Sequence, residues 1–191
     1  MRQSPLLVTG ATGFLGGFLV RELALRGYDN VRCLVRSDSD TASLMELGFQ
    51  VRVGDLGDLD SMVAALDSVE GIINLASLGF GHAPKIATAC RQAALVKGVF
   101  MSTTAIFTTL PAKTKAIRLE AERHIGGLPF ASTILRPTMI YGSRDDRNIH
   151  RLVNYLRKYP FIPIFGSGKH LQQPVYVGDV ARAVLDAYET R

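Results

Sequence analysis

The chain alternates short, wholly apolar runs with longer segments in which apolar residues recur at helical spacing. The apolar runs predict strands at residues 6–8, 31–35, 49–53, 71–76, 98–102, 130–135 and 174–177. The helical spacings predict helices at residues 15–26, 43–47, 60–66, 85–96, 115–125, 147–156 and 180–188. Strands that are apolar throughout and separated by helices are typical of a parallel sheet covered on both faces. Such sheets bind ligands beyond the carboxyl ends of their strands, so the residues there are the candidates for function.

The first strand runs directly into a glycine-rich turn. Residues 9–16 read Thr-Gly-Ala-Thr-Gly-Phe-Leu-Gly and lead into the first helix. Gly10 can make the tight turn, Gly13 lets backbone N–H groups approach a pyrophosphate, and Gly16 lets the helix pack close to the strand. An ordinary strand, turn and helix with surplus glycines is the alternative. The predicted dinucleotide-binding residues of this turn are Gly10, Thr12, Gly13, Phe14, Leu15 and Gly16.

Length and composition favour one globular unit. With 191 residues, of which 47% are hydrophobic, the chain can bury a core and is expected to form a single domain over residues 1–191. No apolar run approaches the about 20 residues that cross a bilayer, so no membrane contact is expected. The first strand begins too close to the N-terminus to leave room for a signal peptide, which predicts a cytoplasmic protein.

The cysteines and the net charge argue against metal sites, disulfide frameworks and nucleic-acid partners. Cys33 and Cys90 have the spacing of neither a metal site nor a disulfide framework, so both are expected to be core residues and no metal is expected. The formal net charge of +5 is spread along the chain. A diffuse positive charge suits an anionic cofactor or substrate and argues against a nucleic-acid partner.

Arg36 ends the second predicted strand, where an NAD-binding unit usually carries an acidic residue for the ribose 2′-hydroxyl. A guanidinium can instead pair with a 2′-phosphate, and the hydroxyl of Ser37 follows it. We therefore expect NADP(H) in preference to NAD(H). The alternative is a solvated arginine, with Asp38 or Asp40 reaching the ribose.

Polar residues also end the later strands. Asp55 could accept from an adenine amine or hold a turn. Asn74 could bond the backbone or a ribose, and the small Ala76 leaves room for a cofactor. Ser102 and Thr103 end the fifth strand and are the candidate catalytic hydroxyls, with simple capping of the strand exit as the alternative.

The motifs together resemble the atypical and extended short-chain dehydrogenase/reductases, the NAD(P)-dependent epimerase/dehydratase-like proteins. Beyond the glycine turn they are Gly54-Asp55-Leu56, Asn74-Leu75-Ala76-Ser77, Ser102-Thr103-Thr104, Leu-Arg-Pro-Thr-Met-Ile-Tyr-Gly at 135–142 and Val-Tyr-Val-Gly-Asp-Val-Ala at 175–181. The resemblance implies an α/β fold, a Rossmann-type doubly wound parallel sheet with helices on both faces. It also implies cofactor contacts by Asp55 and Leu56 at the adenine, by Asn74 and Ala76 along the cofactor, and by Pro137, Thr138 and Met139 beside the nicotinamide.

The family's catalytic Tyr-x-x-x-Lys pair is missing. Counting back from the Arg-Pro motif puts the two positions on Thr114 and Arg118, whereas anchoring on Lys115 puts the tyrosine position on Pro111. Neither replacement is a tuned phenolic acid. His82 is the one imidazole expected near the nicotinamide, either as a substitute acid or as a loop residue without a role.

Extended family members continue into a smaller substrate domain, which is expected to be reduced or absent here. Residues 161–165 are apolar and proline-broken, and predict an edge strand or lid, or part of a homodimer contact. Basic residues from Arg144 to Lys158 are expected to form a solvated face.

Two functions fit the sequence. One is an NADP(H)-dependent oxidoreductase or epimerase/dehydratase-like enzyme with an atypical site and a small-molecule substrate. The other is a non-catalytic NADP(H)-binding regulatory or assembly module without a substrate. Nucleotide-sugar epimerisation is not expected, because that chemistry relies on the tyrosine and on a substrate domain.

Overall fold

The computed structural model describes residues 4–109, 111–144, 146, 149–162, 164, 166–169 and 171–190. The strands are β1 (Leu6–Thr9), β2 (Val31–Val35), β3 (Gln50–Val53), β4 (Gly71–Asn74), β5 (Lys97–Met101), β6 (Ala131–Leu135), β7 (Ile140–Tyr141) and β8 (Val175–Tyr176). The α-helices are α1 (Phe14–Leu25), α2 (Ala42–Glu46), α3 (Leu59–Leu66), α4 (Ala83–Gln92), α5 (Lys115–Gly126), α6 (Ile149–Lys158) and α7 (Val177–Glu189). Two 3-10 turns are η1 (Leu78–Phe80) and η2 (Thr104–Phe107).

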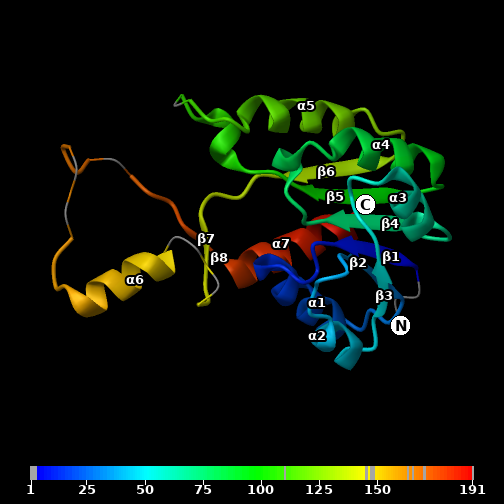
Figure 1. The fold of residues 1–191 in the computed structure, drawn as a ribbon, viewed down its shortest axis with the longest axis horizontal. Coiled ribbons are helices and arrows are strands. Elements are labelled where there is room, and N and C mark those ends of the chain that lie inside the picture. Colours follow the sequence, from blue (N-terminus) through cyan, green and yellow to red (C-terminus); the bar gives the residue numbers. More distant parts are fainter. Residues whose placement is uncertain are drawn as a thin grey trace.

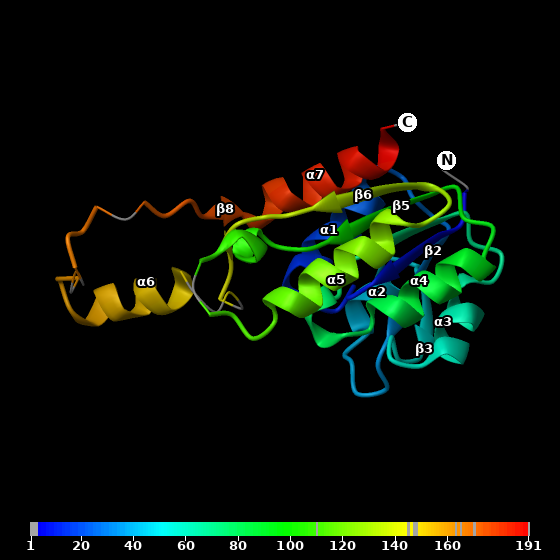
Figure 2. The same ribbon diagram turned by 90° about the horizontal axis from the view of Figure 1, so that it is seen from above.

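Six strands form one parallel sheet in the order β3-β2-β1-β4-β5-β6. This is the order of a doubly wound dinucleotide-binding sheet, whose switch point lies between β1 and β4. Figures 1 and 2 show α1 and α7 on one face and α3, α4 and α5 on the other. The predicted Rossmann-type fold class is therefore confirmed.

Each strand divides its side chains between two cores. On β1, Leu6 and Val8 belong to the cluster under α1 and α7, whereas Leu7 belongs to the cluster under α3 and α4. Successive side chains of a strand point to opposite faces, so a strand covered on both faces must be apolar at every position. All of β1 and β4 is buried. This explains why the sequence shows continuous apolar runs.

Most predicted elements agree with the structure, and the differences have local causes. Helix α4 begins earlier than predicted because Pro84 occupies its first turn, where a missing N–H costs nothing. It ends at Gln92, after which Ala93 is extended and the chain turns into β5. Helix α7 begins at Val177 rather than Val180, directly after the two-residue strand β8.

A distal segment, made of the described residues between 149 and 174, extends away from the sheet beyond the carboxyl ends of its strands (Figure 1). Helix α6 has no buried residue. Phe161, Ile162 and Ile164 are exposed and form no strand, while Pro163 and Phe165 lie outside the described residues, as does Arg147 of the predicted basic face. Within the described part of the chain, no helix combines the length and the apolar character needed to cross a membrane.

Candidate functional site

Two glycines of the turn, Gly10 and Gly16, have no room for a side chain. Gly10 has a φ of 73°, and a Cβ there would lie 2.9 Å from the backbone nitrogen of Ala76. A Cβ on Gly16 would overlap the carbonyl oxygen of Gly10, so α1 packs directly on the turn. Gly13 is the residue before α1 and has extended backbone, and it is exposed together with Thr12. The turn thus presents the N-terminus of α1 to solvent, which is the arrangement that binds a phosphate.

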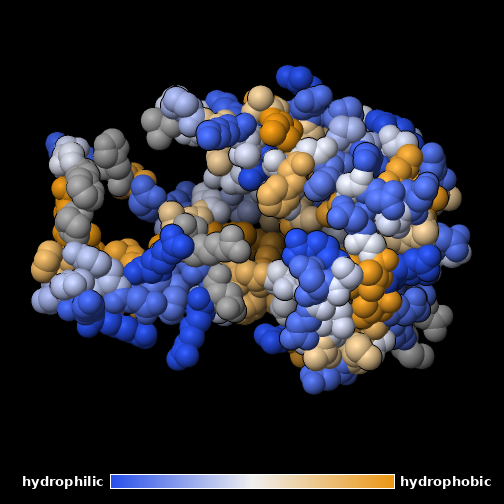
Figure 3. Space-filling view, in the orientation of Figure 1, coloured by the Kyte–Doolittle hydropathy of each residue, from blue (hydrophilic) through white to orange (hydrophobic). Residues whose placement is uncertain are grey.

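An open cleft of about 1380 Å³ lies beside this turn. It is bounded by the first half of α1, by η2 with the residue before it, and by the stretch after β6. Figure 3 shows the hollow between these parts of the surface. Six of the predicted residues line it: Thr12, Gly13, Phe14, Thr103, Thr138 and Met139.

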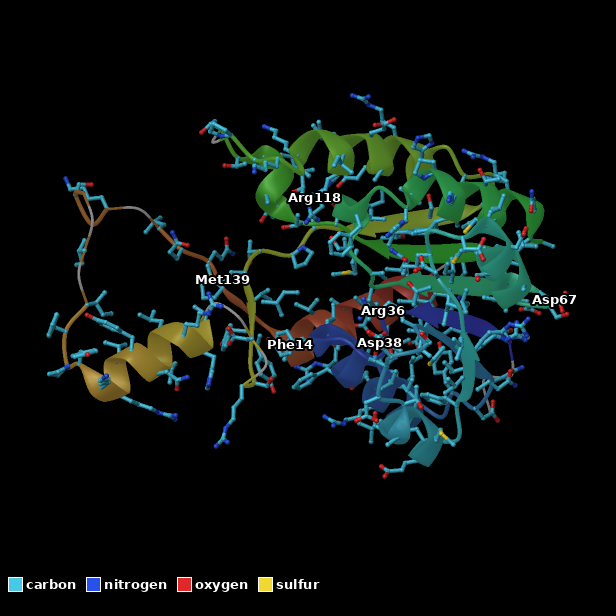
Figure 4. All side chains as sticks on the ribbon, viewed as in Figure 1. Phe14, Arg36, Asp38, Asp67, Arg118 and Met139 are labelled. Atoms are coloured by element: carbon cyan, nitrogen blue, oxygen red, sulfur yellow. The ribbon has the colours of Figure 1, made fainter. Side chains whose placement is uncertain are left out.

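Arg36 and Ser37 lie beyond β2, outside this cleft. The Arg36 Nε is 3.4 Å from the Asp38 Oδ1, and both side chains are 74% exposed. Figure 4 shows the two side by side, away from Phe14 and Met139. Arg36 and Asp38, two of the candidates for contact with the ribose, therefore lie at the same end of β2.

Asn74 and Asp55 hold the backbone. Asn74 is fully buried, and its amide accepts from the hydroxyl of Thr9 at 2.7 Å and donates to the carbonyl of Ala76 at 3.0 Å. The Asp55 carboxylate accepts from the Gly57 N–H at 2.6 Å and so forms a turn, but it remains exposed. Leu56 packs partly against the core under α3 and α4.

Ser102 lies behind the cleft rather than in its lining. It is 7% exposed, and its hydroxyl makes no hydrogen bond of good geometry within the described residues. Glu122 on α5 accepts from Arg136 at 3.0 and 2.7 Å. This guanidinium, helped by the nearby Ser102 hydroxyl, holds the pKa of the Glu122 carboxyl below its usual value. Sequence reasoning missed Glu122, because no motif indicates that a carboxylate of α5 meets the arginine that follows β6.

Arg118 and Lys115 are the two positions that the sequence offers for the family's lysine. The Arg118 guanidinium lies so close to Gly79 that a Cβ on that glycine would be 2.9 Å from the guanidinium carbon, and the Arg118 Nε is 3.3 Å from the Thr114 hydroxyl. Lys115 instead donates to the carbonyl of Thr108 at 2.6 Å. Figure 4 shows Arg118 beneath α5, toward the strand ends.

The His82 imidazole lies away from the cleft. Its ring lies against Gly57, at the exit of β3, and it directly precedes α4. It is absent from the lining of the cleft. The structure therefore places this imidazole outside the cleft, and its relation to a nicotinamide stays a prediction.

The cysteines are buried, and burial raises the pKa of both Cys33 and Cys90 to about 12. Both thiols are therefore protonated at neutral pH and poor nucleophiles. Among the residues that the structure describes, no cluster of His, Cys, Asp and Glu could hold a metal ion.

The parallel sheet has the strand order β3-β2-β1-β4-β5-β6, and its first strand enters α1 through a turn in which Gly10 and Gly16 have no space for a side chain. Together these features define the dinucleotide-binding class of α/β proteins. The NmrA-like family model matches residues 2–117, and the 3-beta hydroxysteroid dehydrogenase/isomerase family model matches residues 115–190. The chain belongs to the NmrA-like family. The predicted resemblance to atypical and extended short-chain dehydrogenase/reductases is thereby confirmed.

Individual relatives are more distant. The mitochondrial NADH dehydrogenase [ubiquinone] 1 alpha subcomplex subunit 9 of Arabidopsis thaliana is 30% identical, over 94% of this chain and 49% of its own. A 4-hydroxy-2-methyl-3-oxo-4-farnesyl-3,4-dihydroquinoline-1-oxide ketoreductase of Stigmatella aurantiaca is 26% identical, over 95% and 64%. The structure of MoeE5 in complex with UDP-glucose and NAD is 27% identical, with a TM-score of 0.77 over 98% of this chain and 73% of its own.

Two facts follow from these relatives. The chain spans about half the length of the first curated relatives, 49% of the Arabidopsis protein. That protein and its namesakes in Mus musculus and Dictyostelium discoideum are mitochondrial. The cytoplasmic location predicted from the sequence is contradicted by this finding.

Proposed function

We propose that this chain binds NADP(H), with the pyrophosphate at the N-terminus of α1 and the 2′-phosphate at Arg36. The observation that carries the proposal is the glycine turn, in which three positions have no space for a Cβ or present a bare backbone to solvent. Arg36 supports the choice of NADP(H), because its guanidinium is largely exposed at the strand end where a ribose would lie.

Nucleotide titrations of an Arg36→Ala variant test this assignment. We expect NADPH binding to weaken by about tenfold or more, since a charge-assisted bidentate pair contributes about 1.5–3 kcal/mol. NADH binding should hardly change. Arg91→Ala, an exposed arginine on α4, is the control and should bind both as the unaltered protein does. Equal losses for the two nucleotides in Arg36→Ala would remove the preference for NADP(H).

We further propose that the cleft is the reaction site of an oxidoreductase-like enzyme. A bound nicotinamide would supply or accept the hydride. The residues of this chain would position it with Thr138 and Met139 and polarise a substrate carbonyl with the hydroxyl of Thr103. Water in the open cleft would supply the proton that the reduced oxygen takes up. Thr103 Oγ1 accepts from the Ala105 N–H at 3.2 Å, and a hydroxyl that accepts one bond can still donate its own proton. Ser102 supports this wall from behind.

NADPH consumption with a panel of aldehydes, ketones and quinones tests the catalytic step. We expect slow turnover that Thr103→Val abolishes. Thr109→Val, at an exposed threonine outside the lining, is the matched control. Tight NADPH binding without turnover of any substrate would contradict the enzyme.

A non-catalytic binding module is the second candidate, favoured by one observation. Counting back from the Arg-Pro motif puts the family's tyrosine and lysine on Thr114 and Arg118, which contact each other, and a threonine has no acidic proton to give. Relatives named as subunits of NADH dehydrogenase agree with a role in assembly. Thr114→Tyr combined with Arg118→Lys separates the two candidates: new carbonyl reduction in the double variant alone would show that the native site has lost catalysis.

A further inference from the structure

The distal segment holds most of the net charge of this chain. Residues 149–174 include four lysines and arginines and no aspartate or glutamate, so they contribute +4 of the formal charge of +5. The rest of the chain is therefore nearly neutral, and one segment accounts for the basic character. The four basic residues are Arg151, Arg157, Lys158 and Lys169, and all of them are exposed.

Helix α6 separates its apolar residues from its basic ones. Leu152, Val153 and Leu156 recur at spacings of three and four residues and share one face of the helix. Arg151 and Lys158 are seven residues apart and lie on the opposite face. Because no residue of α6 is buried, both faces are open. An exposed helix with one apolar and one basic face is typical of helices that lie on a membrane surface.

Aromatic rings extend the apolar surface at the end of α6. The ring centroids of Tyr155 and Tyr159 are 5.1 Å apart, and the centroid of Phe161 is 6.2 Å from that of Tyr159. The Lys158 ammonium lies 5.3 Å from the centroid of the Tyr159 ring. Ile164, farther along the segment, is 71% exposed. Tyrosine rings next to basic residues suit the boundary between lipid headgroups and hydrocarbon, because each ring has an apolar body and a polar tip.

The distal segment also stands clear of the sheet. Figures 1 and 2 both show α6 and the chain that follows it extending beyond β7 and β8. Figure 3 shows hydrophobic and hydrophilic residues next to one another along this segment. A flat surface can therefore reach α6 while the sheet and the glycine turn stay in water.

We propose that the distal segment binds the surface of an anionic lipid bilayer, with α6 lying in the plane of the headgroups. The leucines and the aromatic rings would enter the headgroup boundary, and the basic residues would pair with lipid phosphates. The charge favours this partner over a second copy of the chain. A second distal segment would bring another +4 toward the first, whereas an anionic surface attracts it.

This contact differs from a membrane span. The chain was expected to make no membrane contact because it lacks an apolar run long enough to cross a bilayer, but a helix that lies on the surface needs no such run. The proposed lipid-binding surface is also separate from the proposed dinucleotide site and does not depend on it.

Co-sedimentation with lipid vesicles tests the proposal. We expect the protein to sediment with vesicles of equal parts phosphatidylglycerol and phosphatidylcholine, and to stay in solution with vesicles of phosphatidylcholine alone. Binding should be lost in about 1 M salt, where the Debye length falls to about 3 Å. Amide hydrogens of α6 should exchange more slowly when the mixed vesicles are present, while those of α5 should not change.

Two double variants separate the apolar contribution from the basic one. Leu152→Ser with Leu156→Ser, and independently Arg151→Gln with Lys158→Gln, should each weaken vesicle binding about tenfold or more. Because α6 buries no residue, neither pair of substitutions removes a core contact, and circular dichroism checks that the variants are folded.

Matched controls lie on other helices. Leu25→Ser changes an apolar residue of α1 that is 82% exposed, and Arg91→Gln with Arg123→Gln neutralises two exposed arginines on α4 and α5. Both controls should bind the mixed vesicles as the unaltered protein does.

Three results would overturn the proposal. The first is equal binding to both kinds of vesicle, or binding to neither. The second is binding that either pair of substitutions in α6 leaves unchanged. The third is a dimer that forms without lipid in light scattering and that Leu152→Ser with Leu156→Ser dissociates, because a second copy would then cover the apolar face.

Discussion

The buried carboxylate of Glu122 on α5 pairs with Arg136 and lies near Ser102, so it links residues that follow two different strands. Its side chain is 9% exposed and pairs with Arg136, which follows β6, while Ser102 follows β5. Because the ion pair holds the pKa of the Glu122 carboxyl below its usual 4.5, the carboxylate stabilises the folded chain above that pH. The stabilisation is lost as the pH falls through the lowered pKa of the folded state.

We therefore expect Glu122→Gln to lower the free energy of unfolding at pH 7 by about 1–2 kcal/mol. The difference from the unaltered protein should shrink as the pH falls below 4.5, because the unfolded chain then binds a proton that the folded carboxylate still excludes. Urea unfolding at pH 7 and at about pH 3 measures both values. Glu120→Gln changes a carboxylate that is 67% exposed and is the control. An undiminished difference at the acidic pH would contradict the role given to the ion pair.

At the scale of single residues, the sequence predicted backbone conformation better than it predicted where polar side chains point. The roles of Gly10 and Gly16 follow from the missing Cβ, which the structure shows to be required. The direction of a polar side chain depends instead on neighbours that are distant in sequence. Asn74 bonds the backbone of Ala76, which is one of the two roles that the sequence left open. Its bond with Thr9 and the position of His82 against Gly57 depend on the fold, and no motif indicates them.

Arg26 joins the helices of one sheet face. It follows α1 and contacts Glu22 of that helix at 3.0 Å, and Asp186 and Glu189 of α7 at 2.7 and 2.9 Å. Arg26→Ala would remove the cation that these three carboxylates share. We expect it to lower the free energy of unfolding by about 1–2 kcal/mol at low salt and by less at high salt, since ions screen the attraction.

Arg182→Ala is the control, because Arg182 forms an exposed pair with Asp179 within α7. Chemical unfolding of both variants at two salt concentrations gives the comparison. An equal effect of the two substitutions would mean that Arg26 does not join the helices.

Helix α6 lacks the packing that stabilises the other helices. An isolated helix of 10 residues is marginally stable in water. Helix α5, by contrast, buries Ala121 and Ile125. We expect amide hydrogens of residues 149–158 to exchange at rates near those of an unprotected chain, and those of α5 to be strongly protected. Hydrogen exchange read by mass spectrometry measures both helices in one experiment.

The same measurement addresses the homodimer contact, which is one of the alternatives that the sequence left open. The large exposed apolar residues described in the distal segment are Leu152, Val153, Leu156, Tyr159, Phe161, Ile162, Ile164 and Leu171. If a second copy covers them, exchange in α6 should slow as the protein concentration rises. Strong protection at every concentration would contradict the prediction for α6.

At the scale of elements, the inner strands were predictable because burial on both faces makes them apolar except at their last residue, as in β1 and β4. Strand β8 lies within the predicted strand at 174–177 but is only two residues long, and β7 was not predicted, since a strand that short has no periodicity of its own. Helix α6 shows the opposite case. Its period predicts a helix, but not whether anything packs on it.

The predicted dinucleotide-binding residues and the residues proposed to act on a substrate come largely from different parts of the chain. All six strands of the sheet and the glycine turn lie within residues 6–135, whereas the distal segment leaves the far side of the cleft open. The fold could be predicted from alternating elements and ordered motifs. The chemistry could not, because it depends on which side chains reach the cleft from η2 and from the stretch after β6.

This separation predicts that residues 1–191 bind the dinucleotide without any further part. A ligand that binds only the folded state at 100 times its dissociation constant adds about 2.7 kcal/mol of stability. For a chain of 191 residues this corresponds to a rise in Tm of about 5–10 °C. Thermal unfolding followed by circular dichroism, with NADPH and with NADH, measures the shift. The Arg36→Ala variant should lose most of the Tm shift with NADPH and keep the Tm shift with NADH. If neither nucleotide shifts the Tm of the unaltered chain, residues 1–191 do not bind the dinucleotide by themselves.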